Sequence, residues 1–192
     1  MCGVAGIYAK HRPMNGSVLH YMTERLLHRG PIEGGYYVSH PIHMGMRRLS
    51  IIDIEGGQQP VYNEDRTIAV MLNGQIYNYV ELMMELQTRG HTFYTRSDTE
   101  VIAHMYEEMG VKCLHRFNGM FVMAIWDVPK QQLFLARDRL GVKPMYYHDG
   151  VDFFAYASEL KSLLLCPFVS RDLDLESFED YLAFMYTRAP RT

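Results

Sequence analysis

Hydrophobic and polar positions along the first half of the chain change between strand-like and helix-like spacing. Residues 2–8 are small and apolar, which predicts a buried strand at the start of the chain. We expect a helix over residues 17–29, ended by Gly30, because apolar side chains recur there every three to four positions. Residues 36–38 and 44–54 are predicted strands, and a pair of arginines interrupts the second of them.

From residue 68 onward the chain carries clearer start and stop signals. Alternation over residues 68–72 predicts a half-buried strand. Two helices follow, each opened by the residue pair of a capping box and closed by a glycine: Asn78, Glu81 and Gly90, then Ser97, Glu100 and Gly110. The remaining pattern predicts strands over 121–126, 133–136, 145–147 and 153–157, a helix over 159–165, and another around Leu175, Phe178 and Leu182.

Strands and helices therefore come in clusters rather than in strict alternation. This arrangement predicts an α+β fold with layered antiparallel sheets and argues against a doubly wound parallel sheet. The length of 192 residues allows about one large domain.

Composition excludes several classes of protein. An apolar fraction of 48% and a charged fraction of 21% are typical of a folded globular chain. The net charge of −3 offers no basic footprint for nucleic acid, and no apolar run approaches the roughly 20 residues that span a membrane. Three cysteines do not suggest a disulfide framework, and without a signal-peptide pattern we expect a cytoplasmic protein.

Cys2 is the first candidate for chemistry. If Met1 is removed, Cys2 carries a thiol beside a free α-amine, whose ordinary pKa of about 7.7–8.0 lets it act as the base for that thiol. One residue would then supply both nucleophile and base. Taken alone, the position favours the simpler interpretation, a small buried residue at the start of a strand.

Asn73 and Gly74 are the second candidate. Between two strands this pair would form a tight hairpin turn, but here it follows a predicted strand and precedes a predicted helix. The alternative is an oxyanion hole, in which the Asn side-chain amide and the Gly N–H donate to a developing oxyanion.

Two charged residues could hold an α-amino acid. Arg48 could form a bidentate pair with a carboxylate, and Asp98 could bind an ammonium group. The competing interpretations are a solvent-facing arginine and an aspartate that compensates a helix dipole. His40 and His43 lack further ligands at suitable spacing, so no metal site is predicted.

Taken together in chain order, these residues resemble the class II glutamine amidotransferase domain, and most closely the glutaminase domain of glutamine-hydrolysing asparagine synthetases. Five motifs carry the resemblance from Cys2 to Glu100, and three more follow it. They are residues 1–7, His28–Pro31, Arg48–Asp53, Asn73–Asn78, Ser97–Glu100, Phe117–Phe121, Arg137–Pro144 and Ala157–Lys161.

The resemblance implies a four-layer αββα sandwich of the N-terminal nucleophile hydrolase type. It also implies that Cys2 attacks the side-chain amide of glutamine and that Asn73 and Gly74 hold the tetrahedral intermediate. Arg48 would bind the substrate carboxylate and Asp98 its ammonium group, with help from the residue at position 75. No cofactor is implied for this domain.

The chain departs from the family pattern at two places. Gln75 stands where the family usually has Glu, and the lost charge predicts weaker glutamine binding. After His28–Pro31 the family usually has Asp, whereas this chain has Ile32 followed by Glu33. These departures are the best support for an alternative, a degenerate domain used for interaction rather than catalysis.

The resemblance also sets expectations for the whole protein. Residues 1–170 are expected to form the glutaminase domain, and residues 171–192 to open a linker or a second, synthetase-like domain. That domain, in cis or in trans, would use ATP and Mg²⁺ and consume the ammonia. Asparagine synthesis or a related ATP-dependent amidation is the expected use of the ammonia, amidation of a sugar or a secondary metabolite is the alternative, and a homodimer is left open.

Overall fold

The computed structural model describes residues 1–188. In chain order its strands and helices are β1 (Gly3–Ala9), α1 (Gly16–Glu24), β2 (Glu33–Ser39), β3 (Ile42–Arg48), β4 (Val61–Tyr62), β5 (Ile68–Ile76), α2 (Tyr79–Thr88), α3 (Asp98–Met109), the 3₁₀ helix η1 (Gly110–His115), β6 (Gly119–Asp127), β7 (Gln132–Arg137), β8 (Tyr146–Asp149), β9 (Phe153–Ala157), α4 (Leu160–Leu163) and α5 (Leu175–Phe184).

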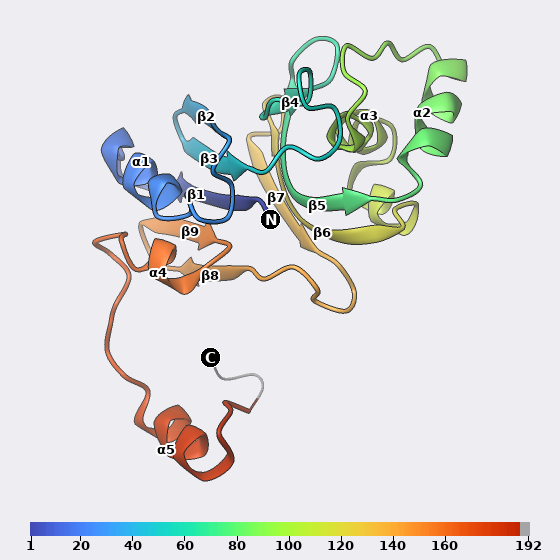
Figure 1. Cartoon of the computed structure of the whole chain (residues 1–192). Helices are drawn as coiled ribbons and strands as arrows, with labels where there is room; N and C mark the ends of the chain where they lie inside the picture. The colour runs from blue at the N-terminus through green and yellow to red at the C-terminus, as the bar shows by residue number, and fades with distance from the viewer. Residues whose placement is uncertain (189–192) are drawn as a thin grey trace.

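The strands form two antiparallel sheets that face each other (Figure 1). One sheet has the order β2-β3-β1-β9-β8, and the other has the order β4-β5-β6-β7. Every neighbouring pair is antiparallel, including the central β1–β3 and β5–β6 pairs. The predicted α+β fold is therefore confirmed.

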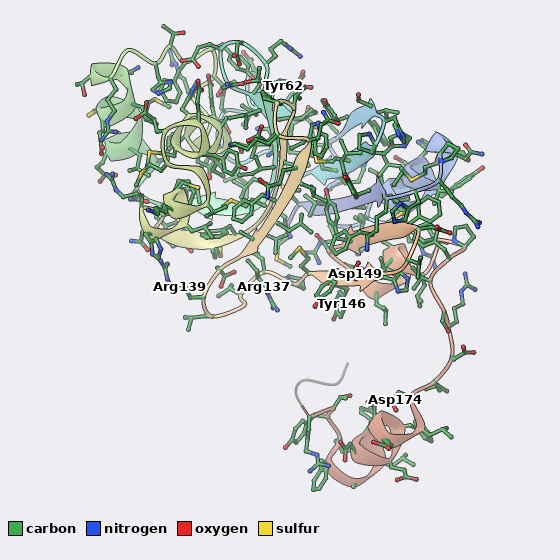
Figure 2. All side chains as sticks on the ribbon, turned by 180° about the vertical axis from the view of Figure 1, so that it is seen from behind. Tyr62, Arg137, Arg139, Tyr146, Asp149 and Asp174 are labelled. Carbon is green, nitrogen blue, oxygen red and sulfur yellow. The ribbon has the colours of Figure 1, made fainter. Side chains whose placement is uncertain are left out.

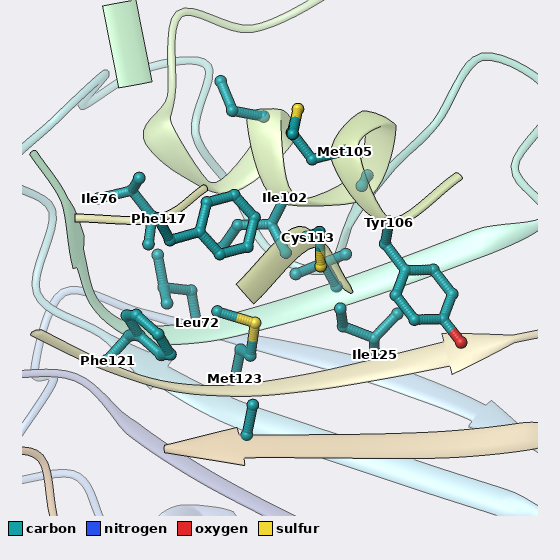
Figure 3. Close-up of a cluster of buried hydrophobic side chains, with 14 of the residues drawn as sticks. Leu72, Ile76, Ile102, Met105, Tyr106, Cys113, Phe117, Phe121, Met123 and Ile125 are labelled. Atoms are coloured by element: carbon teal, nitrogen blue, oxygen red, sulfur yellow. The ribbon is translucent and has the colours of Figure 1, made fainter. Parts of the chain in front are cut away.

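Three apolar cores define four layers. Between the sheets, side chains from β1, β3 and β9 pack against others from β5 and β6, with Trp126 among them. On the outer face of the second sheet lie α3 and η1, and Figure 3 shows this core around Met105, Cys113 and Phe121. Helices α1 and α4 cover the outer face of the first sheet. Each large apolar side chain buried in these cores contributes about 1.5–3 kcal/mol to stability.

The small residues of β1 have a packing reason. A Cβ atom added to Gly6 would lie 2.4 Å from the ring of Tyr156, which sits opposite it on β9. Strand β1 therefore needs a residue without a side chain at position 6, so that the Tyr156 ring fits between the sheets. This crowding holds the start of the chain firmly in the centre of its sheet.

Three predicted elements are shorter in the structure, and the helix expected over 159–165 is regular only over Leu160–Leu163. The predicted strand over 44–54 ends at Arg48, because the guanidinium of Arg48 binds the carbonyl oxygens of Ile52 and Asp53 at 2.8 Å and draws that segment into a loop. The predicted helix over 17–29 is regular only to Glu24. Beyond it the N–H groups of Leu26, Leu27 and Arg29 bond to the third preceding carbonyl, and these tight turns preserve the apolar spacing that suggested a longer helix.

The two predicted capping boxes have different outcomes. Ser97 caps α3 by accepting the N–H of Thr99 at 3.1 Å, but Glu100 accepts the N–H groups of Tyr94 and Thr95 instead of that of Ser97. Asn78 does not cap α2. Its side chain bridges Arg116 and Asn118 beyond η1, where it ties two distant segments together.

The final helix lies apart from the sandwich (Figure 1). Its N-cap residue, Asp174, accepts the N–H of Glu176 at 3.2 Å, and Figure 2 places Asp174 well away from the loop that carries Arg137 and Arg139. The division between residues 1–170 and 171–192 stays a prediction, and its last four residues lie outside the described part of the chain. Over residues 1–188 no helix combines the length and apolar character needed to cross a membrane.

Candidate active site

All six residues expected at the site line one cavity of about 200 Å³, which we call the Cys2 cavity. It opens where the start of β1, the end of β3, the middle of β5 and the N-terminus of α3 meet. Its lining includes the predicted residues Cys2, Arg48, Asn73, Gly74, Gln75 and Asp98. Residues spread over almost a hundred positions are thus brought together by the sandwich.

The half-buried Cys2 is fixed at both its side chain and its backbone. The N–H of Leu49 lies 3.4 Å from Cys2 Sγ, and Leu49 O lies 3.7 Å from the same sulfur. Arg29 Nε donates to the carbonyl oxygen of Cys2 at 2.8 Å. The backbone of Leu49 and the guanidinium of Arg29 thus fix where the sulfur and the main chain of Cys2 lie.

Arg29 is itself held by a carboxylate from the other end of the chain. Glu159 Oε1 accepts from Arg29 Nη1 and pairs with His28 Nε2, both at 2.9 Å, and Glu159 Oε2 lies 3.0 Å from Lys161 Nζ. Burial opposes ionisation, but hydrogen bonds from Arg29, His28 and Lys161 outweigh it and lower the pKa of Glu159 to about 2. The motifs around residues 28–31 and 157–161 therefore form one support for Cys2.

Asn73 and Gly74 lie inside a strand rather than in a turn. They belong to β5 and pair with Val122 and Phe121 of β6, so the hairpin interpretation is wrong and the strand is longer than predicted. A Cβ on Gly74 would lie 2.2 Å from Met120 O. Glycine is therefore required here by the close approach of the neighbouring strand.

Ser158 holds the Asn73 side chain. Its hydroxyl oxygen accepts from Val4 N at 3.0 Å and from Asn73 Nδ2 at 3.5 Å. Asn73 is almost fully buried, so its amide has few other orientations. One N–H of Nδ2 is turned to Ser158, which leaves the other available to a ligand in the Cys2 cavity.

Arg48 lines the cavity, but its guanidinium group also holds neighbouring loops in place. Both terminal nitrogens bind protein groups: Nη1 pairs with Glu33 and Nη2 binds the carbonyl oxygens of Ile52 and Asp53. Arg48 is buried and so contributes a fixed positive charge to one wall of the cavity. Its role in binding a substrate carboxylate stays a prediction.

Asp98 supplies the negative charge of the site. It is 5% exposed, and its Oδ2 accepts the N–H of Ile76 at 2.9 Å. Burial raises the pKa of Asp98, and the hydrogen bonds from Ile76 and Ser97 and the charge of Arg48 offset that rise only in part. A buried carboxylate is suited to an ammonium group, because the incoming cation compensates its desolvation.

The two departures from the family pattern differ in their surroundings. Gln75 pairs with Met120 in the β5–β6 ladder and lines the cavity beside Asp98. Ile32 points to solvent with 58% of its surface exposed, while Glu33 binds both Arg48 and the hydroxyl of Ser50. In this chain the loop carboxylate that pairs with Arg48 therefore comes from position 33.

Lys143 and Ser158 are site residues to which the sequence reasoning assigned no role. Lys143 lines the cavity with only 6% of its surface exposed, and its ammonium group has no partner among residues 1–188. Asp138 positions it by accepting the N–H groups of Val142 and Lys143. Both residues fall within motifs that carried the resemblance, which was the only signal available for them.

Comparison with known proteins agrees with this geometry. The whole chain, residues 1–192, matches the family described as glutamine amidotransferase domain. The chain belongs to this family. It is 39% identical over 197 residues to glutamine-hydrolysing asparagine synthetase 1 of Bacillus subtilis (strain 168), which covers 100% of this chain and 31% of that protein. It is 43% identical over 178 residues to asparagine synthetase 2 of the same organism, covering 91% of this chain and 24% of that protein.

Solved structures show the same fold. Glutamine phosphoribosylpyrophosphate amidotransferase of B. subtilis, complexed with ADP and GMP, has a TM-score of 0.69 at 22% identity, over 85% of this chain and 43% of that chain. The allosteric regulatory enzyme of purine biosynthesis has a TM-score of 0.71 at 23% identity, over the same shares of each chain. The chain spans about a quarter to a third of the length of the asparagine synthetases it matches.

Proposed function

We propose that this domain hydrolyses glutamine to glutamate and ammonia, with Cys2 as the nucleophile. The observation that carries the proposal is the shared cavity, which is lined by a thiol, an amide donor, a buried anion and a buried cation. A glutamine molecule offers the matching groups: an amide carbon, a carbonyl oxygen, an ammonium and a carboxylate. Membership in the amidotransferase family supports the same reaction.

Each step of the reaction has a residue suited to it. Once Met1 is removed, the free amine of Cys2 takes the thiol proton, directly or through a water, and the thiolate attacks the amide carbon. Asn73 Nδ2 and Gly74 N–H donate to the resulting oxyanion. The amide nitrogen takes up a proton and leaves as ammonia, and water then hydrolyses the thioester to glutamate and regenerates the thiol.

Met1 decides whether the base is available. It lines the cavity next to Cys2, and while it is attached the nitrogen of Cys2 is a peptide amide that cannot accept a proton. We therefore propose that removal of Met1 is required for activity. Asp98, Arg48 and Gln75 would hold the ammonium and carboxylate groups of the substrate.

We further propose that the ammonia serves an ATP-dependent synthetase domain, in cis or in trans. The support is that the relatives are named as glutamine-hydrolysing asparagine synthetases and are three to four times longer. ATP and Mg²⁺ would bind that domain, while glutamine hydrolysis itself needs no cofactor. Cysteines that are all free fit the cytoplasm as the place of action.

The test is glutamate release by a chain whose loss of Met1 is verified by intact mass. We expect the processed chain to hydrolyse glutamine and both the unprocessed chain and Cys2→Ala to lack turnover. Full activity of Cys2→Ala would exclude Cys2 as the nucleophile. A glutamine-mimicking electrophile should label Cys2, and failure to label the processed chain would favour a degenerate, non-catalytic domain.

A further inference from the structure

A second group of polar side chains lies outside the Cys2 cavity, and no motif pointed to it. Glu64, His91, His104 and Glu107 each offer a ligand atom, and these atoms all lie within 4.8 Å of one another. Glu64 follows β4, His91 lies between α2 and α3, and the other two belong to α3. We call these four residues the histidine–glutamate cluster.

Both histidines of the cluster lie between carboxylates. His91 Nδ1 is 3.1 Å from Glu64 Oε1, and its Nε2 is 3.3 Å from Glu108 Oε1. His104 Nδ1 is 3.2 Å from Glu64 Oε2, and its Nε2 is 3.4 Å from Glu100 Oε1. A neutral imidazole has one N–H, so in each ring one nitrogen must face an oxygen with its lone pair.

In His104 one ring nitrogen, Nδ1, lacks a hydrogen-bond partner within the described part of the chain. Its side chain is fully buried, and its Nδ1 makes no hydrogen bond although it lies close to Glu64 Oε2. If Nε2 donates to Glu100, the lone pair of Nδ1 points into the cluster. A buried polar atom without a partner is costly, typically about 1–3 kcal/mol, so the arrangement calls for a further group at this place.

The charges around the cluster point to a cation as that group. Four carboxylates surround the two rings, and Arg89 pairs with one of them, Glu108, at 3.0 Å. Glu100 also accepts the N–H groups of Tyr94 and Thr95. These contacts bring no positive charge to the carboxylate oxygens of Glu64, which lie next to His91 Nδ1 and His104 Nδ1. Protonation of both rings or a bound metal ion would supply that charge.

We propose that Glu64, His91, His104 and Glu107 bind one divalent transition-metal ion, with Zn²⁺ the best fit. Two imidazole nitrogens and two carboxylates form a nitrogen–oxygen set that zinc binds tetrahedrally. The surrounding contacts are those of a built site. Glu108 and Glu100 orient the two imidazoles through Nε2, and Asn63 Nδ2 donates to Glu107 Oε2 at 3.0 Å.

Such an ion would join three segments that are separate in sequence. These are the turn after β4, the connection between α2 and α3, and the middle of α3. The four protein ligands complete a tetrahedral coordination sphere and leave no position for a substrate. A closed coordination sphere is typical of a structural metal site. The half-exposed carboxylate of Glu64 gives the ion a route in from solvent.

The test is metal titration of the 192-residue chain carrying Cys2→Ala, because a free thiol at Cys2 would bind zinc by itself. The other two cysteines interfere little, since burial raises the pKa of Cys113 and of Cys166 to about 12. We expect one equivalent of Zn²⁺ to bind and to raise Tm. Co²⁺ should show the strong visible absorption of a tetrahedral ion.

Variants locate the ion. Glu108→Gln, which alters an orienting carboxylate, should weaken Zn²⁺ binding roughly 10–100-fold. His91→Gln and Glu64→Gln, which remove ligands from the partly exposed side, should weaken it at least as much. His115→Gln is the matched control, an exposed histidine of η1 outside the cluster, and should leave the affinity unchanged.

Any of three results would overturn the proposal. One is the absence of stoichiometric binding of Zn²⁺ and Co²⁺ near neutral pH. Another is binding that His91→Gln and Glu64→Gln leave unaltered. Nitrogen NMR that finds both nitrogens of His91 and His104 protonated in the presence of Zn²⁺ would show that protons, and not a metal, balance the carboxylates.

Discussion

Helix α3 serves two polar sites, Asp98 in its first turn at the Cys2 cavity and His104 and Glu107 further along in the histidine–glutamate cluster. Asp98 and His104 are six residues apart, roughly 9 Å along the helix. In the cavity two buried cations, Arg48 and Lys143, and a buried anion, Asp98, line the same space. In the cluster carboxylates face imidazoles, with no arginine or lysine among the four residues.

The two sites also shift carboxylate pKa values in opposite directions. Burial raises the pKa of Asp98. At Glu64 burial acts in the same sense, but backbone N–H groups of Glu64 and Thr92 and the nearby His104 and His91 outweigh it, so the pKa of Glu64 is lowered. The lining residues differ in the same way: the cavity has buried charges of both signs, whereas the cluster has carboxylates and imidazoles only.

The largest expected effect comes from substituting one asparagine at each site, Asn73 at the Cys2 cavity and Asn63 beside the histidine–glutamate cluster. Asn73→Ala removes a donor to the oxyanion and should lower kcat by about 10²–10³ while metal binding is unchanged. Asn63→Ala removes the N–H that orients Glu107 and should weaken Zn²⁺ binding roughly 10–100-fold. Steady-state glutaminase assays and zinc titrations on both variants make the measurement.

The reciprocal outcome is the control. Asn63→Ala should keep kcat within about twofold, since Asn63 contacts Thr67, Ile68 and Glu107 and none of the cavity lining. If Asn73→Ala kept wild-type kcat, Asn73 would have no part in the oxyanion hole. If either variant impaired both properties, the two sites would not be independent.

The next effect is a pH dependence set by Asp98. An ammonium group needs the ionised carboxylate, so glutamine binding should be lost as pH falls through the raised pKa of Asp98. The acid limb of kcat/KM should then lie above 3.8, the ordinary value for aspartate. Asp98→Asn should raise the KM for glutamine about 10–100-fold, in line with the roughly 1.5–3 kcal/mol of a charged hydrogen bond, and remove that limb.

Stability provides the control for Asp98. A raised pKa in the folded state means that this carboxyl group favours folding below its unfolded pKa and that the benefit is lost as pH rises through the folded value. At neutral pH the ionised Asp98 therefore costs stability, and Asp98→Asn should leave Tm equal or higher. A marked fall in Tm would mean that the raised KM reflects unfolding.

The Cys2 cavity was largely predictable because its residues occur in contiguous motifs. Cys2 precedes β1, Asn73–Gly74 lie within β5, and Ser97–Asp98 begin α3, and all line one cavity. The loop after Arg48 was not predictable from spacing. Its shape depends on where one guanidinium finds its acceptors, and a run of apolar residues does not reveal this.

The histidine–glutamate cluster could not be predicted for a different reason. Glu64, His91 and His104 are separated by 27 and 13 positions, and they meet only when α3 packs across β5. These separations match no usual spacing of metal ligands along a sequence. His40 and His43, which are close in sequence, do not belong to the cluster. Short spacing is a good guide only when the ligands share one element.

A smaller effect is expected at Ser158, which acts on Asn73 by positioning it. Ser158→Ala removes the acceptor for Asn73 Nδ2 and for Val4 N. At about 1 kcal/mol for one hydrogen bond, kcat should fall about fivefold, with KM unchanged because Ser158 does not line the cavity. A rise in KM without a fall in kcat would exclude this positioning role, and a lower Tm alone would indicate that only the bond to Val4 matters.

The smallest expected effect is tighter binding of glutamine after a substitution that makes the Cys2 cavity more acidic, and so more like the histidine–glutamate cluster. Gln75→Glu adds a second carboxylate beside Asp98, and an ion pair with the substrate ammonium is worth about 0.2–1 kcal/mol in a partly solvated position. The KM for glutamine should fall up to about fivefold with kcat unchanged. Gln58→Glu adds the same charge outside the Cys2 cavity and is the matched control. An unchanged KM in Gln75→Glu would show that position 75 does not contact the ammonium, so that Asp98 alone supplies its negative charge.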